Sequence, residues 1–312
     1  MPSPVLGWVL AAIVLTGLLL RWTRTSSQLL VSLIALSPLV VVPLVGLAIT
    51  TWRTWDRRLG LALVVLTSAY VASFVSFGSV VGCGPTSADD EIAIYTHNVW
   101  WKRGEPDALA RSIEASDADV LVLQEVTSAM VDALGEHPLL EGDYRYRANE
   151  PSDVDTTGLA VWSRYPIGDA AVEVLGASTP VLRTTIESPS GPFRLGAIHV
   201  TAPLDGATTD AWDDELDQLA GADPSSPALL VGDFNATDDH EQFRAILEAG
   251  WTDAHGPKGC GYDATWPEER IWPTMFRLDH VLMSSHFEAL AVDVGDGASS
   301  DHRPVIARVR LS

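Results

Sequence analysis

Several apolar segments of the sequence end in carboxylate, amide or imidazole side chains, which are the residue types that bind metal ions and transfer protons. The residues at these segment ends are Asn98, Glu125, His199, Asp233 with Asn235, Asp279 with His280, and Asp301 with His302. Carboxylate and amide oxygens are hard ligands suited to Mg²⁺ or Mn²⁺, and histidines can bind phosphoryl oxygens or move protons. These residue types therefore indicate the rim of an active site that binds a divalent metal ion.

Strands and helices in mixed order are expected to position these side chains along one edge of packed sheets. Apolar runs predict strands at residues 91–95, 118–123, 144–147, 158–163, 181–187, 193–200, 228–231, 277–283 and 305–311. Amphipathic or polar runs predict helices at residues 106–115, 128–134, 208–219 and 240–249. The order of these elements is not a strict βαβ repeat, and no internal repeat is evident in the sequence.

Each motif has a simple structural interpretation when it stands alone. The GDFN sequence at residues 232–235 could be an ordinary turn after a buried strand. His280 is interpreted as a strand residue and is excluded from the catalytic set, and the many other acidic residues are interpreted as solvated faces. The combination of the motifs in one chain favours a functional site over these separate interpretations.

Between His97 and Arg310 the chain contains, in this order, HNVW, DVLVLQEV, TTGLAVWSRYPI, LGAIHV, LLVGDFNA, RLDHVLM and SSDHRPV. In these motifs it resembles the endonuclease/exonuclease/phosphatase superfamily, which includes DNase I, exonuclease III, neutral sphingomyelinases and inositol polyphosphate phosphatases. The resemblance implies an α/β sandwich of the DNase I-like kind, in which two mixed β-sheets pack face to face and are flanked by helices. It also implies metal-dependent hydrolysis of a phosphate ester.

The resemblance assigns the metal ligands and the residues around the attacking water. Glu125 matches the main metal carboxylate of the superfamily, Asn98 matches an amide of the metal site, and Asp301 supports the metal side. The implied cofactor is Mg²⁺, with Mn²⁺ as the alternative. Asp233 matches the residue that orients or deprotonates the attacking water, and Asn235 matches an amide that binds the phosphate.

The resemblance also assigns the histidines. His302 matches the histidine that contacts the scissile phosphate, and Asp279 matches the carboxylate that orients it. His199 follows the DNase I and sphingomyelinase branches, in which a histidine at this strand end assists phosphate binding or protonates the leaving group. Arg183 corresponds loosely to a phosphate-contacting arginine of the DNase I branch.

Composition divides the chain into a membrane anchor at residues 1–83, a linker at residues 84–90 and a catalytic domain at residues 91–312. Cys83 and Cys260 lie far apart, without the spacing of a zinc site. The chain carries 20 Lys and Arg against 41 Asp and Glu, and nearly all of the acidic residues follow Cys83. A strongly acidic domain repels polyanions, so nucleic acid is not the favoured partner.

Three apolar stretches, at residues 4–20, 29–49 and 61–81, each have close to the roughly 20 residues that a transmembrane helix requires. The short segments between them carry tryptophans beside arginines, as expected at a membrane interface. The second of these segments contains more arginines than the first, so the positive-inside rule places it in the cytoplasm. The prediction is a multi-pass protein of the cell membrane with an extracytoplasmic catalytic domain. The lipid bilayer is the expected partner, and no obligate protein partner is indicated.

The tether and the acidic surface favour a phospholipid headgroup or a small phosphodiester as substrate. Trp266 and Trp272 lie in a proline-flanked loop before a catalytic strand and are candidates for substrate contact. One alternative is an extracytoplasmic endonuclease or exonuclease acting on DNA or RNA. Its candidate basic residues are Lys102, Arg103, Arg145, Arg147 and Arg164. Another alternative is a catalytically silent tethered binding module, which the intact polar motifs disfavour.

Overall fold

The computed structural model describes residues 19–36, 60–65, 90–258, 263–268 and 273–312, with the single positions 12, 16, 49, 57 and 68. Most residues of the three apolar stretches predicted to span a membrane lie outside the described residues. Within the described residues, no helix combines the length and the apolar character needed to cross a bilayer.

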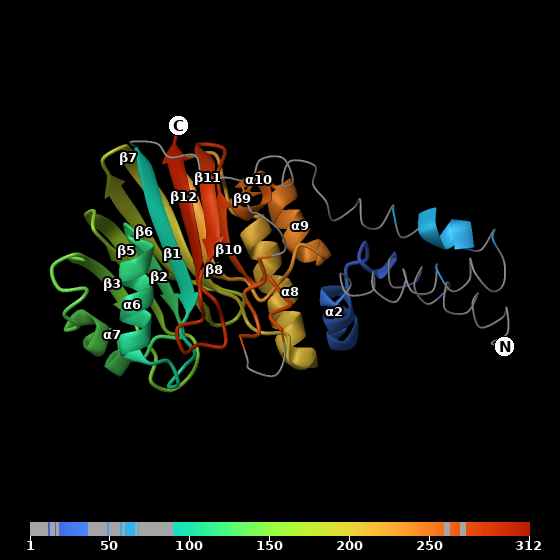
Figure 1. Ribbon diagram of the computed structural model, residues 1–312, viewed down its shortest axis with the longest axis horizontal. Helices are drawn as coiled ribbons and strands as arrows, with labels where there is room; N and C mark the ends of the chain where they lie inside the picture. The colour runs from blue at the N-terminus through green and yellow to red at the C-terminus, as the bar shows by residue number, and fades with distance from the viewer. Residues whose placement is uncertain are drawn as a thin grey trace.

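The catalytic part is built from two six-stranded sheets that face each other (Figure 1). The first sheet has the order β11-β12-β1-β2-β4-β3 and the second has the order β5-β6-β7-β8-β10-β9. The strands of the first sheet are β1 (Glu91–Asn98), β2 (Val120–Gln124), β3 (Tyr146–Glu150), β4 (Leu159–Ser163), β11 (Phe287–Val294) and β12 (Val305–Leu311). Those of the second are β5 (Ile167–Leu175), β6 (Thr179–Ser188), β7 (Gly191–His199), β8 (Ala228–Asp233), β9 (Thr252–Asp253) and β10 (Asp279–Met283).

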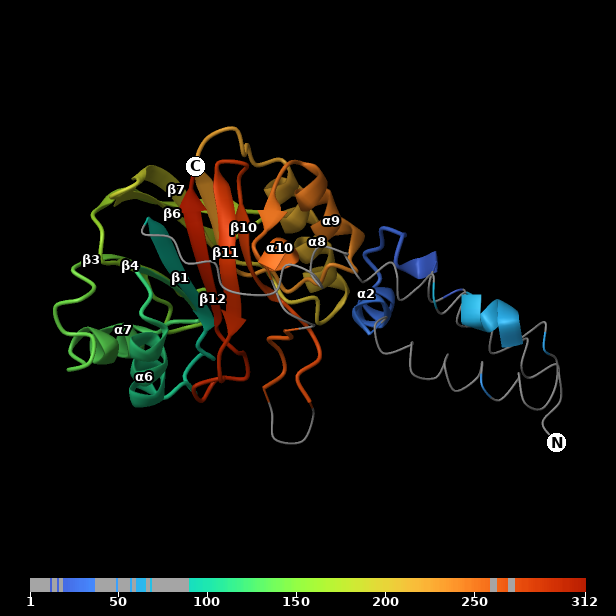
Figure 2. The same cartoon turned by 45° about the horizontal axis from the view of Figure 1, so that its top comes forward.

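Helices cover the outer face of each sheet (Figures 1 and 2). On the first sheet they are α6 (Pro106–Ser116) and α7 (Ser128–Gly135), and on the second they are α8 (Gly206–Ala220) and α9 (Glu241–Glu248). The short α10 (His255–Lys258) lies beside the edge strands β9 and β11. A further helix, α2 (Gln28–Ala35), lies against α8 and α9. The expected α/β sandwich of two mixed sheets flanked by helices is therefore confirmed.

Apolar side chains on both faces of the central strands explain why these strands read as continuous apolar runs. In β1, Ile92 and Ile94 point into the core between the sheets, whereas Ala93 and Tyr95 pack beneath α6. In β8 of the second sheet, Leu229 and Val231 likewise point into the core between the sheets, whereas Ala228 and Leu230 pack beneath α8 and α9. Burial on both faces fixes the register, because a slip by one residue would exchange the two sets of side chains.

Strand pairing brings the polar strand ends together at one edge of the sandwich. β1 runs parallel to β2 with Asn98 opposite Gln124, and β7 runs parallel to β8 with His199 opposite Asp233. β10 runs antiparallel to β8, which places Asp279 opposite Asp233. Parallel strands end at the same edge of a sheet, so each sheet contributes polar side chains to a shared site.

Besides the two-residue β9, two strands lack a signal in the sequence. β5 forms an edge of its sheet and leaves most of its side chains exposed, so it shows little apolar alternation. β11 contains a shift in its pairing with β12 between Ala289 and Ala291, which interrupts the period of two on which strand prediction depends.

His280, excluded from catalysis on sequence grounds, forms a buried ion pair between β9 and β10. Its Nδ1 lies 2.8 Å from Oδ2 of Asp253 and its Nε2 lies 3.0 Å from the Ala236 carbonyl oxygen. Burial would lower the pKa of His280, but the charge of Asp253 outweighs burial and raises it. Burial would likewise raise the pKa of Asp253, but His280 and Arg277 hold it at about 2. The pair therefore stabilises the second sheet as ions.

The substitution His280→Gln is expected to lower the free energy of unfolding by about 3 kcal/mol at pH 5.5, because it leaves the buried Asp253 carboxylate without the closer of its two cationic neighbours. The folded-state pKa of His280 lies above 6.5, so its contribution is complete below pH 6.5 and is lost as the pH rises through the raised pKa. Urea unfolding of wild type and variant between pH 5.5 and 9 should show this decline. His286→Gln is the control, and a difference that does not change with pH would contradict the ion pair.

Candidate active site

The polar strand ends line one cavity of about 640 Å³, which is within the usual size range of ligand pockets. Its lining includes Asn98, Glu125, His199, Asp233, Asn235, Trp266, Asp301 and His302. Residues separated by more than two hundred positions thus meet in one place. The convergence expected from the sequence is present.

Asn98 joins the two sheets at the centre of this site. Its amide Nδ2 donates to Oε1 of Glu125 at 2.9 Å and to Oδ2 of Asp233 at 3.1 Å. Its Oδ1 accepts a hydrogen bond from the backbone N–H of Trp100 at 3.1 Å. Glu125 follows β2 of the first sheet and Asp233 ends β8 of the second, so one amide holds carboxylates from both sheets.

Glu125 is held in a backbone conformation that favours glycine. β2 ends at Gln124, and the next residue, Glu125, has φ 62°. Such a conformation costs a non-glycine residue about 1–3 kcal/mol and persists only when its surroundings enforce it. Here the backbone N–H of Trp101 donates to Oε2 of Glu125 at 2.7 Å. The turn directs the carboxylate into the cavity instead of continuing the strand.

Gly232 allows β8 to turn Asp233 toward the site. Gly232 has φ 144°, and a Cβ atom added there would lie 1.9 Å from the carbonyl oxygen of Ile198 on β7. Only glycine fits this approach. Oδ1 of Asp233 then accepts the backbone N–H of Asn235 at 2.8 Å. Burial and the nearby charge of Asp279 raise the pKa of Asp233.

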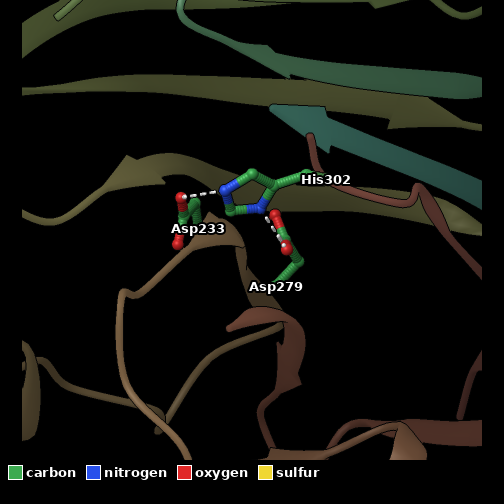
Figure 3. A group of neighbouring side chains, drawn as sticks. All are labelled: Asp233, Asp279 and His302. Atoms are coloured by element: carbon green, nitrogen blue, oxygen red, sulfur yellow. Dashed lines mark hydrogen bonds and ion pairs between the residues drawn. The ribbon is translucent and has the colours of Figure 1, made fainter. Parts of the chain in front are cut away.

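His302 lies between two aspartates, as Figure 3 shows. Its Nδ1 is 2.8 Å from Oδ2 of Asp279, and its Nε2 is 3.7 Å from Oδ2 of Asp233. Burial alone would lower the pKa of His302, but the two carboxylates outweigh burial and raise it to about 10. Burial would raise the pKa of Asp279, yet the His302 charge lowers it. His302 is therefore an imidazolium at neutral pH, suited to stabilising negative charge rather than accepting a proton.

His199 presents one nitrogen to the same carboxylates. Its Nδ1 lies 3.0 Å from the carbonyl oxygen of Thr156, which can only accept, so Nδ1 carries the hydrogen. Its Nε2 lies 3.8 Å from Oε1 of Glu125 and 3.8 Å from Oδ2 of Asp233. The ring is thus oriented by the backbone with Nε2 facing the cavity.

The cavity has an excess of negative charge that a divalent cation would balance. Glu125, Asp233 and Asp301 all line it, and none of the described lining residues is Lys or Arg. Burial and the charge of Glu125 contribute to a raised pKa of Asp301, although His302 opposes this. Hard oxygen donors with unbalanced charge are the donor set that Mg²⁺ or Mn²⁺ prefers. These residues fit such a cation.

His302 is not among the side chains that fit the cation, even though ligand atoms of Asp233, Asp279 and His302 all lie within 4.8 Å of one another. Its Nδ1 is bonded to the Asp279 carboxylate, so the ring is assigned to this ion pair and not to the cation. The assignment of Asn98, Glu125 and Asp301 as the oxygen ligands stays a prediction.

Comparison with known proteins agrees with this geometry. The model of the Endonuclease/Exonuclease/phosphatase family matches residues 95–302, which include all of the motifs above except the last three residues of SSDHRPV. The chain belongs to this family. A comparison with curated proteins found no match.

Solved structures share the fold of this family member. An endonuclease/exonuclease/phosphatase from Beutenbergia cavernae is 19% identical, with a TM-score of 0.57 over 72% of this chain and 72% of that one. A mannosyl-6-phosphatase from Bacteroides thetaiotaomicron is 17% identical, with a TM-score of 0.54 over 70% of this chain and 100% of that one. Sphingomyelinase C from Streptomyces griseocarneus is 16% identical, with a TM-score of 0.50 over 70% and 99%. At these identities the likeness shows the fold alone.

Family membership and fold support a phosphoric ester hydrolase. The residues predicted to contact the substrate differ in where the structure places them. Trp266 lines the cavity, and its Nε1 donates to Oδ2 of Asp301 at 3.4 Å. Arg183 is not brought to the site, because it pairs with Glu173 at a second cavity. Trp272 lies outside the described residues.

Most of the basic residues considered for nucleic acid lie at the other end of the first sheet. Gln124, next to Glu125, pairs with Leu159 at the start of β4, whereas Arg164 follows the end of β4. Arg145 and Arg147 flank Tyr146, which pairs with Ser163 at that same distant end. These arginines do not form a basic groove beside the catalytic residues.

Two hydroxyl groups that position the site were not predicted. Oγ of Ser300 donates to the carbonyl oxygen of Asn98 at 2.6 Å and accepts the backbone N–H of His302 at 3.1 Å. Oγ1 of Thr265 accepts the backbone N–H of Leu278 and of Asp279, at 3.0 and 3.3 Å. Ser300 stands within the SSDHRP motif, which is the only signal in the sequence for its role; Thr265 has none.

The substitution Asp279→Asn should move the pKa of His302 from about 10 toward 6.5, because it removes the carboxylate that lies closest to the ring. NMR titration of the imidazole resonances would measure this change. Asp253→Asn is the matched control, since it removes a carboxylate from another buried histidine, His280, and should leave the pKa of His302 unaffected. If His302 titrates alike in wild type and Asp279→Asn, the ion pair assigned here is wrong.

Proposed function

We propose that this protein is a membrane-anchored phosphodiesterase that depends on Mg²⁺ or Mn²⁺ and hydrolyses its substrate by direct attack of water. The observation that carries the proposal is the single hydrogen-bonded cluster of Glu125, Asn98 and Asp233, with the His302–Asp279 pair beside it. It combines oxygen ligands, a buried carboxylate and an imidazolium in one cavity. These are the parts that metal-assisted phosphodiester hydrolysis requires.

A divalent cation held by Glu125, Asn98 and Asp301 would offset the negative charge of the phosphate. Asp233 orients the attacking water and accepts its proton, because burial raises its pKa and strengthens it as a base. His302 donates a hydrogen bond to a phosphoryl oxygen as its negative charge develops. Asp279 keeps His302 protonated and fixes the ring. These assignments make water the nucleophile.

Asn235 and His199 complete the proposed site. The backbone N–H of Asn235 holds the Asp233 carboxylate, while its amide Nδ2 donates to the Val200 carbonyl at 2.9 Å, which fixes the side chain beside the phosphate position. His199 offers Nε2 to the phosphate or the leaving oxygen. Both residues line the cavity, and both belong to the second sheet or the turn that follows it.

For the substrate, we favour a phospholipid headgroup or a small phosphodiester. The excess of acidic residues repels polyanions over long range, and the described lining of the cavity has no Lys or Arg. Three apolar stretches before the domain support a membrane anchor with the domain on the extracytoplasmic side. One structural neighbour is a sphingomyelinase, which is consistent with a lipid phosphodiester.

A nuclease is the second candidate, and one observation favours it. Lys102 lies over the ring of Trp101 at 3.9 Å, and Arg103 lies over the ring of Trp100 at 4.8 Å, in the loop that donates to Glu125. Aromatic and basic side chains in one loop are typical of single-stranded nucleic acid binding. These are only two basic residues in a chain with 41 Asp and Glu against 20 Lys and Arg, so we rank the nuclease second.

Glu125→Gln and Asp233→Asn are each expected to reduce Mg²⁺-dependent hydrolysis of a chromogenic phosphodiester by about 10³-fold or more, because each removes a charge that acts on the reacting groups. Circular dichroism should be unchanged. Glu187→Gln is the control, since Glu187 is exposed and lies on β6 away from the cavity. Retention of more than a tenth of the wild-type rate in both site variants would contradict their assigned roles.

The full-length protein in detergent should be tested with Mg²⁺ or Mn²⁺ against sphingomyelin, phosphoinositides, DNA, RNA and a chromogenic phosphodiester. We expect hydrolysis of a lipid or small phosphodiester, and EDTA should abolish it because the carboxylates then lose their cation. Rapid cleavage of DNA or RNA with no cleavage of the other substrates would replace the proposed function with the nuclease.

A further inference from the structure

The N-terminal segment (residues 21–36) is held on the catalytic domain by ion pairs, although it is distant from the domain in sequence. Nε of Arg21 lies 2.6 Å from Oδ1 of Asp239, just before α9. The guanidinium of Arg24 lies 3.0 Å from Asp213 and 2.5 Å from Asp217, both on α8. Three carboxylates of the domain therefore match two arginines of this segment.

Backbone groups of the N-terminal segment add to this attachment. Nε2 of His240 lies 3.1 Å from the carbonyl oxygen of Val31, and Nε2 of Gln242 lies 3.0 Å from that of Thr25. Burial lowers the pKa of His240 to about 4, so the ring is neutral at neutral pH. These hydrogen bonds fix the position of α2 on the domain, together with the ion pairs of Arg21 and Arg24.

Apolar packing makes α2 part of the domain core. Val31 is 3% exposed and Ile34 is 2% exposed, and Val31 belongs to the same cluster as Trp212 and Phe243 of α8 and α9. Figures 1 and 2 show α2 against these two helices. The opposite face of α2 carries Leu33, which is 46% exposed. The helix is thus oriented with one face toward the domain.

The docked helix also forms a wall of the catalytic cavity. Val31, Ser32, Ala35 and Leu36 line the same 640 Å³ space as the catalytic carboxylates. Leu204, from the loop after β7, lines it as well. The cavity therefore has charged and polar groups at the reacting centre and apolar side chains along α2. A phosphate ester that fills it would place an apolar group against α2.

The place of α2 in the sequence indicates where such a group comes from. α2 occupies the first residues of the apolar stretch at residues 29–49, and these residues pack on the domain. A segment that enters the membrane here would therefore begin after Leu36. The apolar wall of the cavity is thus next in sequence to the residues that are proposed to enter the membrane.

We infer that the N-terminal segment is a substrate-binding wall of the active site, and that the substrate is an amphiphilic phosphodiester whose apolar chain lies against Ala35, Leu36 and Leu204. This inference rests on the proposed phosphodiesterase activity. It goes further in assigning chain recognition partly to Ala35 and Leu36, which lie outside the matched family region, 95–302.

The test compares two substrates with the same leaving group, methyl 4-nitrophenyl phosphate and hexyl 4-nitrophenyl phosphate, with the full-length protein in lipid nanodiscs and Mg²⁺. Each buried methylene contributes about a fourfold gain, so partial burial of the hexyl chain should raise kcat/KM at least about tenfold over the methyl ester. Calorimetry with hexyl phosphate and methyl phosphate measures the same preference in binding, independently of turnover.

Three variants locate the preference. Ala35→Trp fills the cavity beside α2. It should lower the hexyl-to-methyl ratio of kcat/KM at least about fivefold, and the ratio of the binding constants by the same factor. Leu204→Ser removes an apolar side chain that is 74% exposed, so folding should not be affected, and it should lower the ratio about threefold or more. Leu33→Trp is the matched control on the opposite face of α2 and should keep the wild-type ratio.

The outcomes separate this inference from the proposed function. Metal-dependent hydrolysis of both esters with equal kcat/KM would overturn the inference and leave the phosphodiesterase standing. A hexyl preference that Ala35→Trp and Leu204→Ser leave unchanged would also overturn it. An increase in the hydrolysis of both esters on Ala35→Trp would mean that α2 obstructs the site instead of binding the chain. If the wild-type protein hydrolyses neither ester, both the inferred chain-binding wall and the proposed phosphodiesterase activity are wrong.

Discussion

Mutual repulsion among Glu125, Asp233 and Asp301 is the constraint around which the site is organised. Three carboxylates at one cavity repel one another, and the burial of Asp233 adds a cost of desolvation. The protein offsets part of this with donors that have little freedom to move. These are the Asn98 amide, the backbone N–H groups of Trp101 and Asn235, and the His302 imidazolium. The remaining negative charge is what makes the cavity suited to a divalent cation.

This charge cluster is shared between two sheets, and the sandwich core keeps the two halves in register. Asn98 and Glu125 come from the first sheet, whereas Asp233 and Asp279 come from the second. Alternating side chains fill the space between the sheets, so neither sheet can slide without exposing apolar groups. The small distances within the site therefore depend on packing that is far from it. Gly232 and the φ of Glu125 are local adjustments at the point where strands give way to the cavity.

Much of the fold and most of the site residues could be predicted because buried strands have continuous apolar runs and the functional residues follow them directly. β5 and β11 could not, since an exposed edge and a shift in pairing weaken the alternation on which prediction depends. Arg183 shows the limit of a loose alignment, because its strand was found but its side chain pairs with Glu173. The docking of α2 was beyond prediction as well. An apolar stretch indicates burial, but it does not say whether lipid or protein covers each face.

The location of α2 has a consequence for where the enzyme can work. A cavity assembled from both ends of the chain is complete only while the two remain together, so a fragment shed from its N-terminal part would lack one side of its own pocket. If the inferred wall binds substrate, activity depends on the few contacts that hold the N-terminal segment on the domain, such as Arg21 with Asp239 and Arg24 with Asp213. Proteolytic release of that segment would then lower activity without any separate inhibitor.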